Sequence, residues 1–397
     1  MQAVILAGGF GTRLSHVVKD VPKPMAPIAG VPFLEYLYRA LTGQGFDDFV
    51  FLTGHMADVI ENHFRDYGNV RFLREDHPLG TGGALLNAWD MLESEFLLLN
   101  GDTFFDADFS LLYKYKAQSI KEPSILMAVR FSDDVGRYGF VEFDDDYRVK
   151  SFIEKGALPH TQADGFINAG AYLIDKETLK GVHDSFHGEM VSLETDLFPL
   201  FIRDKVFRCL PLGGAFIDIG IPDDYERAQT LIPETLKKER RPALFIDKDG
   251  TLIEDSGYVH GKDIVPVMST LELVRQYKEK GFRLVIITNQ AGVAKGMFSE
   301  NDFLDNINAV LTFYEEHGIS FDGYEYCLFH ENAVIEKFRK KSYARKPWPG
   351  MILKAAERFS IDLGNSVMVG DNREVDSIRL PYLRSIILDK SRSETLG

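Results

Sequence analysis

Residues 2–14 read QAVILAGGFGTRL, and residues 243–250 read ALFIDKDG. Each stretch is a short apolar run that gives way to glycine or aspartate, a pattern typical of a buried strand ending at a functional loop. The chain therefore starts a strand-and-loop unit twice. Between them, residues 233–242 are polar, charged and bounded by prolines, which favours a domain boundary. We predict a first domain over residues 1–235, a linker over 236–241 and a second domain over 242–397.

Length and composition agree with this division. A chain of 397 residues is too long for one ordinary core. Its net charge of −15 argues against nucleic acid as the main partner, because a phosphate backbone selects basic surfaces. The two cysteines, Cys209 and Cys327, fall in different predicted domains, which favours a reducing compartment over a disulfide framework. With no signal peptide and no apolar run near the roughly 18 residues of a membrane span, we expect a cytoplasmic protein. Small-molecule substrates are expected, and a homo-oligomer is left open.

Strand candidates alternate with helix candidates in both halves. In the first half we predict strands near 2–6, 49–52, 70–73, 96–99 and 124–129, and helices near 33–43, 57–65 and 81–91. In the second we predict strands near 243–246, 283–287, 324–328, 366–369 and 384–387, and helices near 269–280, 300–316 and 350–359. This alternation predicts an α/β fold with mainly parallel sheets wrapped by helices, and sites at the carboxyl ends of the strands.

The loop after the first strand is rich in glycine. Gly8, Gly9 and Gly11 let the backbone turn sharply and direct several N–H groups at one anion. Arg13 and Lys23 add cations for phosphate oxygens. Taken alone, the loop is better explained as an ordinary glycine turn with solvent-facing charges.

Together with further blocks, this loop resembles the signature of the sugar-nucleotide pyrophosphorylases. The blocks are PKP at 22–24, GTGGA at 80–84, NGD at 100–102, FIEK at 152–155, NAG at 168–170 and FIDIGIPDDY at 216–225. They follow the family's order over nearly all of residues 1–230. The resemblance implies a Rossmann-like, GT-A-like mixed sheet, and transfer of a nucleotidyl group from a nucleoside triphosphate to a sugar 1-phosphate. The half is most similar to the branch that activates D-glycero-D-manno-heptose 1-phosphate with GTP, although hexose 1-phosphates use the same scaffold.

The resemblance also implies roles for residues of the first half. As catalytic residues, Arg13 would meet the triphosphate and Lys23 the reacting phosphate, while Asp102 and Asp218 would hold Mg²⁺. The nucleotide would contact Leu6, Ala7, Gly8, Gly9, Gly11, Thr12, Arg13, Gly80, Thr81, Gly82, Gly83 and Asp102. The sugar phosphate would contact Gly139, Glu154, Lys155 and Asn168. Because two anions must approach each other, such a site needs cations more than a protein nucleophile.

The second half places two aspartates at a strand end. Asp247 and Asp249 can point to the same side of the chain, where one attacks phosphorus and the other handles the leaving-group proton. An ordinary acidic turn is the alternative for this pair taken alone. With Thr288-Asn289, Arg345-Lys346, and Gly370-Asp371-Asn372 followed by Asp376, however, residues 242–390 resemble the haloacid-dehalogenase-type phosphatases.

This second resemblance implies a haloacid-dehalogenase-like Rossmannoid domain. Asp247 would form an aspartyl-phosphate, and Asp249 would act as general acid and then base. The phosphoryl oxygens would be bound by Thr288, Asn289, Arg345 and Lys346. Mg²⁺ would be held by Asp247, Asp249 and Asp371, with Asp376 as a further candidate, so that both domains use Mg²⁺.

Within this superfamily the half resembles the histidinol-phosphate and heptose-bisphosphate phosphatases, except at one loop. That group usually has a zinc loop built from a Cys, a His and a later Cys-x-Cys pair. Here Cys327 and His330 remain, but residues 331–344 contain no cysteine, so we predict no structural zinc. The segment instead carries Lys337, Arg339, Lys340 and Lys341. One hypothesis is that this basic loop helps to bind a second phosphate of the substrate; a solvated surface explains it at least as well.

The two resemblances meet in one reaction sequence. A heptose 1,7-bisphosphate would lose its 7-phosphate in the C-terminal domain, and the N-terminal domain would transfer a nucleotidyl group, GMP favoured, to the product. The alternatives are another sugar, such as a hexose, and a C-terminal domain that is only regulatory. The intact set of Asp247, Asp249, Thr288, Lys346 and Asp371 argues against the regulatory reading.

Overall fold

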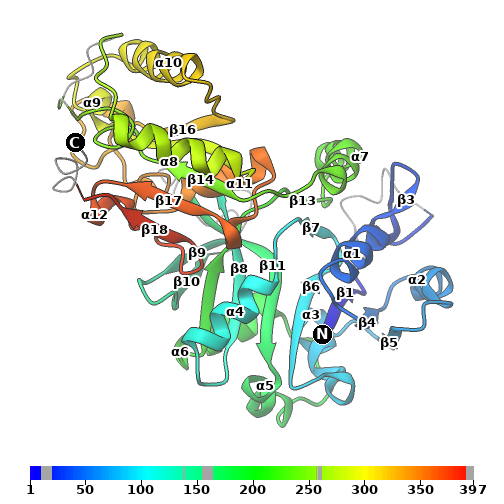
Figure 1. Cartoon of the computed structure of the whole chain (residues 1–397). Coiled ribbons are helices and arrows are strands. Elements are labelled where there is room, and N and C mark those ends of the chain that lie inside the picture. The colour runs from blue at the N-terminus through cyan, green and yellow to red at the C-terminus, as the bar shows by residue number, and fades with distance from the viewer. Residues whose placement is uncertain (10–19, 137–138, 154–163, 256, 258–261, 390–397) are drawn as a thin grey trace. The chain divides into compact units, whose positions relative to one another are not determined.

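The computed structural model describes residues 1–9, 20–136, 139–153, 164–255, 257 and 262–389 (Figure 1). The chain forms two compact units. The N-terminal unit consists of Met1–Arg130 and Val135–Lys238, and the C-terminal unit of Phe131–Asp134 and Glu239–Gly397. Each unit contains its own sheet.

The N-terminal unit is built on a nine-stranded mixed sheet with the order β10-β9-β11-β6-β1-β4-β5, in which β8 pairs with β11 and β12. The strands are β1 (Gln2–Ala7), β4 (Asp48–Thr53), β5 (Val70–Arg74), β6 (Glu95–Asn100), β8 (Ile125–Ser132), β9 (Phe140–Phe143), β10 (Val149–Ile153), β11 (Gly165–Asp175) and β12 (Phe207–Pro211). Strands β6, β1, β4 and β5 are parallel, whereas β11 runs antiparallel to β6 and β9. Because central β1 is covered on both faces, Ala3, Val4 and Ile5 are fully buried and its sequence is continuously apolar.

The helices of this unit are α1 (Phe33–Thr42), α2 (Ala57–Phe64), α3 (Gly80–Asn87), α4 (Ser110–Ser119), α5 (Lys176–His183), α6 (Phe198–Arg203) and α7 (Pro222–Lys237). Helix α1 shows why they pack on the sheet: Phe33, Leu34, Leu37 and Leu41 recur at helical spacing and are buried. Short elements connect the larger ones, namely η1 (Lys23–Met25), β2 (Pro27–Ile28), β3 (Val31–Pro32), η2 (Trp89–Met91) and η3 (Leu193–Leu197).

One short strand pair determines the geometry of the first site. Strands β7 (Thr103–Phe105) and β13 (Phe216–Asp218) pair antiparallel, with Thr103 opposite Asp218. In addition, the Ile219 N–H donates to the Asp102 carbonyl at 3.1 Å. Segments more than a hundred residues apart in the chain are thereby joined, and the two aspartates are brought together.

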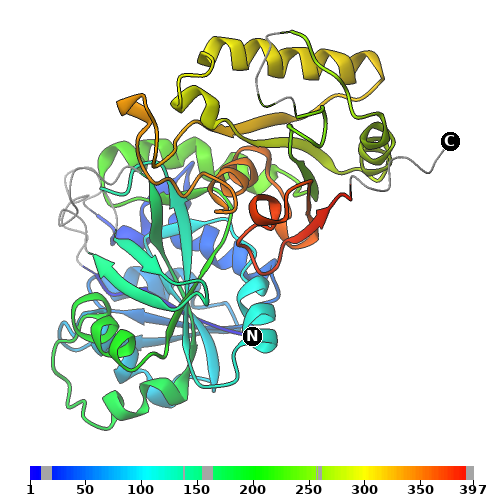
Figure 2. The ribbon, with the colours of Figure 1, turned by 90° about the vertical axis from the view of Figure 1, so that its left-hand side faces the viewer.

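The C-terminal unit contains a five-stranded sheet with the order β16-β15-β14-β17-β18, in which every pairing is parallel. The strands are β14 (Ala243–Ile246), β15 (Arg283–Asn289), β16 (Gly323–Cys327), β17 (Val367–Gly370) and β18 (Arg384–Ile387). The helices and 3₁₀ turns are α8 (Met268–Glu279), α9 (Ala291–Ala294), α10 (Glu300–Glu316), η4 (Glu336–Phe338), α11 (Gly350–Phe359), η5 (Leu363–Asn365) and α12 (Arg373–Asp376). Figure 2 shows the same strands and helices from a second side. The mixed sheet of the first unit and the parallel sheet of the second confirm the predicted fold class.

The stretch between the two sheets is partly helical. Helix α7 continues through Pro233 to Lys237, and β14 begins at Ala243. Ile232 and Thr235 are buried, so the last turns of α7 are packed against protein rather than surrounded by water. Among the described residues, no helix combines the length and the apolar character that a membrane crossing requires.

Candidate active sites

The first site lies where β1 and β6 end. Leu6 of β1 pairs with Asn100 of β6, and the Gly101 N–H donates to the Leu6 carbonyl at 2.9 Å. Asp102 follows directly, and the β7–β13 pair places Asp218 beside it. The carboxylates therefore sit at the carboxyl end of the central parallel strands, where the strand order predicts a site.

A single lysine connects these carboxylates. The Lys23 Nζ atom lies 2.5 Å from Asp102 Oδ2 and 3.3 Å from Asp218 Oδ1. Burial lowers the pKa of the Lys23 ammonium, but the charges and hydrogen bonds of the two aspartates outweigh burial and raise it overall. Burial, followed by the charge of Asp102, raises the pKa of Asp218. Two carboxylates against one ammonium leave a net negative charge, and their oxygen donors are those that Mg²⁺ prefers.

These residues line a cavity of about 520 Å³. Among the predicted site residues, those that line it are Leu6, Gly8, Gly9, Lys23, Gly80, Thr81, Asp102 and Asp218. Ala7 is buried in β1, and Gly82 and Gly83 donate their N–H groups to the Val191 carbonyl at 2.8 and 3.0 Å. The cavity also has walls that sequence reasoning missed, among them Glu75, Pro78, Asn100 and Met190.

Glu75 places a carboxylate in this cavity. Its Oε2 atom accepts a hydrogen bond from the Leu79 N–H at 3.1 Å, and a Cβ atom at Gly8 would lie 3.1 Å from its Oε1 atom. Burial raises the pKa of the Glu75 carboxyl. The residue falls in the polar stretch before the GTGGA block, where one glutamate among several charges gives no signal of its own.

Asn168 and Gly139, predicted to contact the sugar phosphate, lie together. The Asn168 N–H donates to the Gly139 carbonyl at 2.9 Å, and its side-chain Nδ2 atom donates to the Tyr172 hydroxyl at 2.7 Å. The remaining predicted residues of this half, namely Gly11, Thr12, Arg13, Glu154 and Lys155, lie outside the described residues.

The second site lies at the carboxyl edge of the parallel sheet. Asp247 follows β14, Thr288 belongs to the end of β15 and Asp371 follows β17, and these three strands are neighbours. Lys346 enters from a loop, and its Nζ atom lies 2.5 Å from Asp247 Oδ1 and 2.6 Å from Asp376 Oδ1. The loop is held by Asn289, whose side chain exchanges hydrogen bonds of 3.0 and 3.1 Å with the Lys346 backbone.

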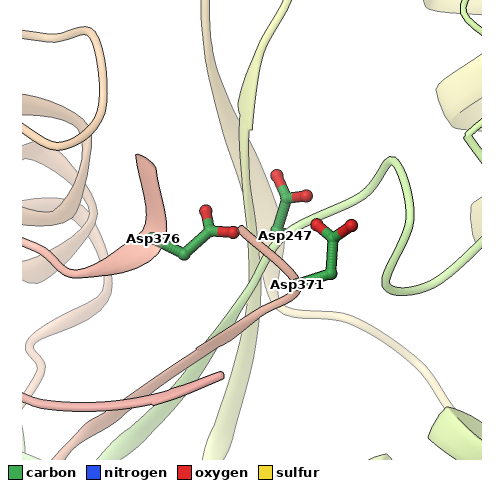
Figure 3. A group of neighbouring side chains, drawn as sticks. All are labelled: Asp247, Asp371 and Asp376. Atoms are coloured by element: carbon green, nitrogen blue, oxygen red, sulfur yellow. The ribbon is translucent and has the colours of Figure 1, made fainter. Parts of the chain in front are cut away.

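Three carboxylates converge here (Figure 3). Asp247, Asp371 and Asp376 each offer an oxygen, and these oxygens lie within 4.8 Å of one another. Both oxygens of Asp376 are already engaged, one by Lys346 and the other by the Asn372 N–H at 3.0 Å. All three aspartates could contribute to holding Mg²⁺; Asp247 and Asp371 follow the neighbouring strands β14 and β17, and Asp376 also positions the Lys346 ammonium. Burial raises the pKa of the Asp247 carboxyl, while Lys346 opposes that shift.

Asp249 has different partners. One of its carboxylate oxygens contacts the Lys248 ammonium, and the other accepts from Gln290 Nε2 at 2.7 Å. Lys248 is fully buried and also donates to Asn306 Oδ1 at 2.9 Å. Asp249 is outside the three-carboxylate group and lines a cavity of about 520 Å³ together with Asn289. A carboxylate beside the nucleophile and open to a cavity suits proton transfer to a leaving group.

The loop that differs from the zinc-binding phosphatases is held by protein contacts. Cys327 Sγ lies 3.9 Å from Ser342 Oγ, and His330 Nδ1 accepts from the Asn332 N–H at 3.0 Å. Neither residue belongs to a cluster of metal ligands within the described part of the chain. The donor set does not fit a closed zinc site, which needs four ligands.

The same loop borders a cavity of about 280 Å³. Its basic lining residues are His330, Lys340, Lys341, Arg345 and Lys346. The Arg345 Nη1 atom is buried and has no hydrogen-bond partner among the described residues. Burial lowers the pKa of Arg345, because the guanidinium has lost part of its contact with water. The cavity is suited to an anion.

Comparison with known proteins finds a matching family model for each half of the chain. A family model described as nucleotidyl transferase matches residues 2–235. The chain belongs to the nucleotidyl transferase family. A second model, described as polynucleotide kinase 3 phosphatase, matches residues 243–381. The nucleotidyl transferase unit is thus followed by the haloacid-dehalogenase-like unit that the motifs predict.

Individual relatives match one unit each. The nucleotidyl transferase unit is similar to the D-glycero-alpha-D-manno-heptose 1-phosphate guanylyltransferase of Campylobacter jejuni, 38% identical over 228 residues, which cover 57% of this chain and 97% of the relative. It is also similar to the crystal structure of HddC from Yersinia pseudotuberculosis complexed with GMP-PN, with a TM-score of 0.50 and 39% identity over 57% of this chain and 97% of that one. The C-terminal unit is similar to the D-glycero-beta-D-manno-heptose-1,7-bisphosphate 7-phosphatase of Yersinia pestis, 40% identical over 134 residues, which cover 34% of this chain and 71% of the relative. Both resemblances seen in the sequence are confirmed.

Proposed function

We propose that this chain is a bifunctional enzyme that prepares a nucleotide-activated heptose. Its C-terminal unit removes the 7-phosphate of a D-glycero-D-manno-heptose 1,7-bisphosphate, and its N-terminal unit transfers GMP from GTP to the resulting heptose 1-phosphate. The observation that carries the proposal is that one chain contains two separately built carboxylate–lysine sites. The relatives of the two units are named for D-glycero-D-manno-heptose phosphates that differ by the 7-phosphate and by the anomer, alpha for the guanylyltransferase and beta for the phosphatase.

In the C-terminal unit Asp247 is the proposed nucleophile. Its carboxylate oxygen forms a bond to phosphorus while the ester P–O bond breaks, and Asp249 gives a proton to the departing sugar oxygen. Asp249 then takes a proton from the water that hydrolyses the aspartyl-phosphate. Lys346 and Thr288 hold the phosphoryl oxygens throughout. Mg²⁺, held by Asp247 and Asp371, would supply charge neutralisation.

In the N-terminal unit no protein nucleophile is needed. An oxygen of the sugar 1-phosphate attacks the α-phosphorus of GTP, and the bond to the β-phosphate oxygen breaks to release pyrophosphate. Lys23 lies between Asp102 and Asp218, which keep it charged, so it can meet a phosphate oxygen when the substrates enter. Mg²⁺, held by these two aspartates, would neutralise part of the triphosphate charge.

The preference for GTP rests on Glu75. The Watson–Crick edge of guanine offers two donors, N1–H and the N2 amino group, and a carboxylate accepts both. Adenine, cytosine and uracil do not offer this pair of adjacent donors. Glu75 presents its carboxylate in the nucleotide cavity next to the backbone of Gly8. We therefore place the guanine edge against Glu75.

The preference for a bisphosphate rests on the basic cavity beside Lys346. The phosphate that is cleaved is accounted for by Lys346 and Thr288. The half-buried Arg345, whose Nη1 atom has no partner among the described residues, and the ammonium groups of Lys340 and Lys341, which lie over aromatic rings, remain to meet another anion. A second phosphate on the sugar supplies one. The basic loop is thus assigned to the 1-phosphate, which the phosphatase must retain for the transferase.

The experiment uses the full chain with Mg²⁺, each anomer of the heptose 1,7-bisphosphate, and GTP, ATP, CTP or UTP in parallel. Phosphate and pyrophosphate are measured separately. We expect phosphate in every tube that contains the α-anomer, and pyrophosphate only with GTP. The anomer matters because the guanylyltransferase relative is named for the alpha form and the phosphatase relative for the beta form. If only the β-anomer is dephosphorylated, the two units do not act in sequence and the coupled proposal is refuted.

A further inference from the structure

A segment outside the predicted site residues forms one wall of the transferase cavity. Residues 188–194, here called the strap, run along the first turn of α3. The Val191 N–H donates to the Leu79 carbonyl at 2.8 Å, and the Val191 carbonyl accepts from Gly82 and Gly83 at 2.8 and 3.0 Å. The strap therefore caps N–H groups at the start of α3 that would otherwise lack partners.

The glycines of α3 admit the strap. A Cβ atom at Gly80 would lie 2.5 Å from the Val191 oxygen, and one at Gly83 would lie 3.0 Å from the Glu189 oxygen. Gly80 also has a φ of +73°, which side chains rarely adopt. These glycines are therefore explained by the close approach of two backbone segments, and the N–H groups of Gly82 and Gly83 are committed to the strap.

Side chains fix the strap at its other end. The Leu193 N–H donates to Thr81 Oγ1 at 2.9 Å, and Thr81 Oγ1 donates to Glu194 Oε2 at 3.2 Å. Leu193 and Leu197 are each 2% exposed, so the segment is anchored in the core. The strap is a fixed wall whose cavity-facing side chain can determine what binds.

That side chain is Met190. It is 70% exposed and lines the cavity together with Pro78 and Thr81. Its Cγ atom lies 3.3 Å from the Cβ position of Gly80. An apolar side chain held in the open on a fixed backbone gains free energy when a ligand covers it.

The position of Glu75 indicates which part of the nucleotide lies beside Met190. Leu79 donates its N–H to Glu75 and accepts the N–H of Val191 on its carbonyl, so Glu75 and the strap are both tied to Leu79. This end of the cavity thus combines a carboxylate with the apolar surfaces of Pro78 and Met190. A planar base fits such a place, with its polar edge on the carboxylate and its face on the apolar wall. Thioether sulfur also makes favourable contacts with aromatic rings.

We propose that Met190 packs against the face of the nucleobase and is a binding residue for the nucleotide rather than for the sugar phosphate. This inference rests on the proposed nucleotidyl transfer. It assigns the strap to nucleotide binding and leaves the sugar phosphate to the Asn168 side of the site.

The test compares Met190→Ala and Met190→Leu with the unaltered full chain, using pyrophosphate release with GTP and heptose 1-phosphate each varied in turn. The expected loss is that of partly uncovering one apolar side chain, a fold-change of about three to ten in affinity. We expect Met190→Ala to raise the KM for GTP about three- to tenfold and to leave the KM for the sugar phosphate within about twofold. Met190→Leu, which restores apolar area, should recover most of the loss.

Met268→Ala is the matched control, because Met268 is 59% exposed in the C-terminal unit and lines no cavity described here. An unchanged KM for GTP in Met190→Ala, or a rise in the KM for the sugar phosphate instead, overturns the inference. Titration of GTP alone onto each variant separates it from the proposed reaction. If the unaltered chain binds GTP but releases no pyrophosphate, the proposed reaction fails while weaker GTP binding by Met190→Ala still supports the inference. Equal binding by both, or no binding by the unaltered chain, refutes it.

Discussion

Replacing Glu75 by glutamine tests the proposed guanine site most directly. The substitution keeps the size of the side chain but removes its charge and places an amide NH₂ against the donors of guanine. Hydrogen bonds to charged groups contribute about 1.5–3 kcal/mol each. Because Glu75 is only half-buried, solvent screens part of this, and we take about 1.5–2 kcal/mol for the loss. This corresponds to a fall of about 12- to 30-fold in kcat/KM for GTP.

The assay is pyrophosphate release at saturating heptose 1-phosphate, with GTP varied and ATP in parallel. Glu122→Gln is the control, since Glu122 is exposed in the same unit. Phosphate release from the bisphosphate by the C-terminal unit normalises each preparation for active protein. The reasoning is refuted if Glu75→Gln lowers kcat/KM for GTP less than about threefold, or lowers it equally for GTP and ATP.

The pH dependence of the KM for GTP is a second test of the Glu75 contact. Burial raises the pKa of Glu75, so the carboxyl gains a proton on acidification sooner than an ordinary glutamate does. A protonated carboxyl accepts less well, and the KM for GTP should rise as the pH falls. In Glu75→Gln this pH dependence should be absent.

Three further predictions concern other residues. Asp247→Asn removes the proposed nucleophile and should lower the rate of phosphate release at least about 10³-fold, while pyrophosphate release from supplied heptose 1-phosphate persists. Loss of both activities would contradict separate sites. Changing Lys340 and Lys341 together to glutamine should raise the KM for the bisphosphate several-fold and leave hydrolysis of a simple phosphate monoester unchanged, and an equal effect on both substrates would remove the assigned 1-phosphate contact. Burial alone would raise the pKa of Glu35, but hydrogen bonds, led by that from His63, outweigh burial and lower it. The charged Glu35 carboxylate therefore stabilises the fold above the ordinary glutamate pKa, and this stabilisation is lost as the pH falls through the lowered pKa of the folded state. At pH 7, Glu35→Gln should lower the free energy of unfolding by about 1–3 kcal/mol. The difference between the variant and the unaltered chain should disappear below about pH 4, which thermal unfolding at several pH values measures.

Long periodic segments could be predicted from the sequence because their signals are local. Helices α10 and α11 and strand β14 begin and end at the predicted residues. For α10 the start is fixed by a capping box, in which Ser299 and Asp302 exchange side-chain and backbone hydrogen bonds. Strand β13, by contrast, has three residues and exists because β7 pairs with it. No local sequence pattern near residues 216–218 predicts this pairing with β7.

The same division applies to the sites. Asp102 and Asp247 follow apolar strands, so their place at a sheet edge could be predicted. Which groups meet them could not be derived from spacing, since Lys23 reaches Asp218 across 195 positions of the chain. Glu75 and Met190 are single residues in connecting segments, and no periodic pattern distinguishes them from ordinary surface residues. For Gly82 and Gly83 the family resemblance implies contacts with a nucleotide, which stay a prediction; that their N–H groups face the Val191 carbonyl could not be predicted from the spacing.

Both units use one lysine between two aspartates, yet the two sites differ in exposure in a way that follows from their chemistry. In each, burial opposes the lysine charge and the carboxylates more than restore it, so the ammonium stays charged for an incoming phosphate. In the transferase unit Asp102 and Asp218 are 37% and 33% exposed, whereas in the phosphatase unit Asp247 and Asp376 are 11% and 1% exposed. The transferase must admit two large anions and release pyrophosphate, which requires an open site. The phosphatase holds one phosphoryl group on Asp247, and burial of this carboxylate keeps the nucleophile aligned with phosphorus. The shared charge pattern therefore reflects the common need to bind phosphate, and the difference in burial separates direct transfer between substrates from transfer through a covalent intermediate.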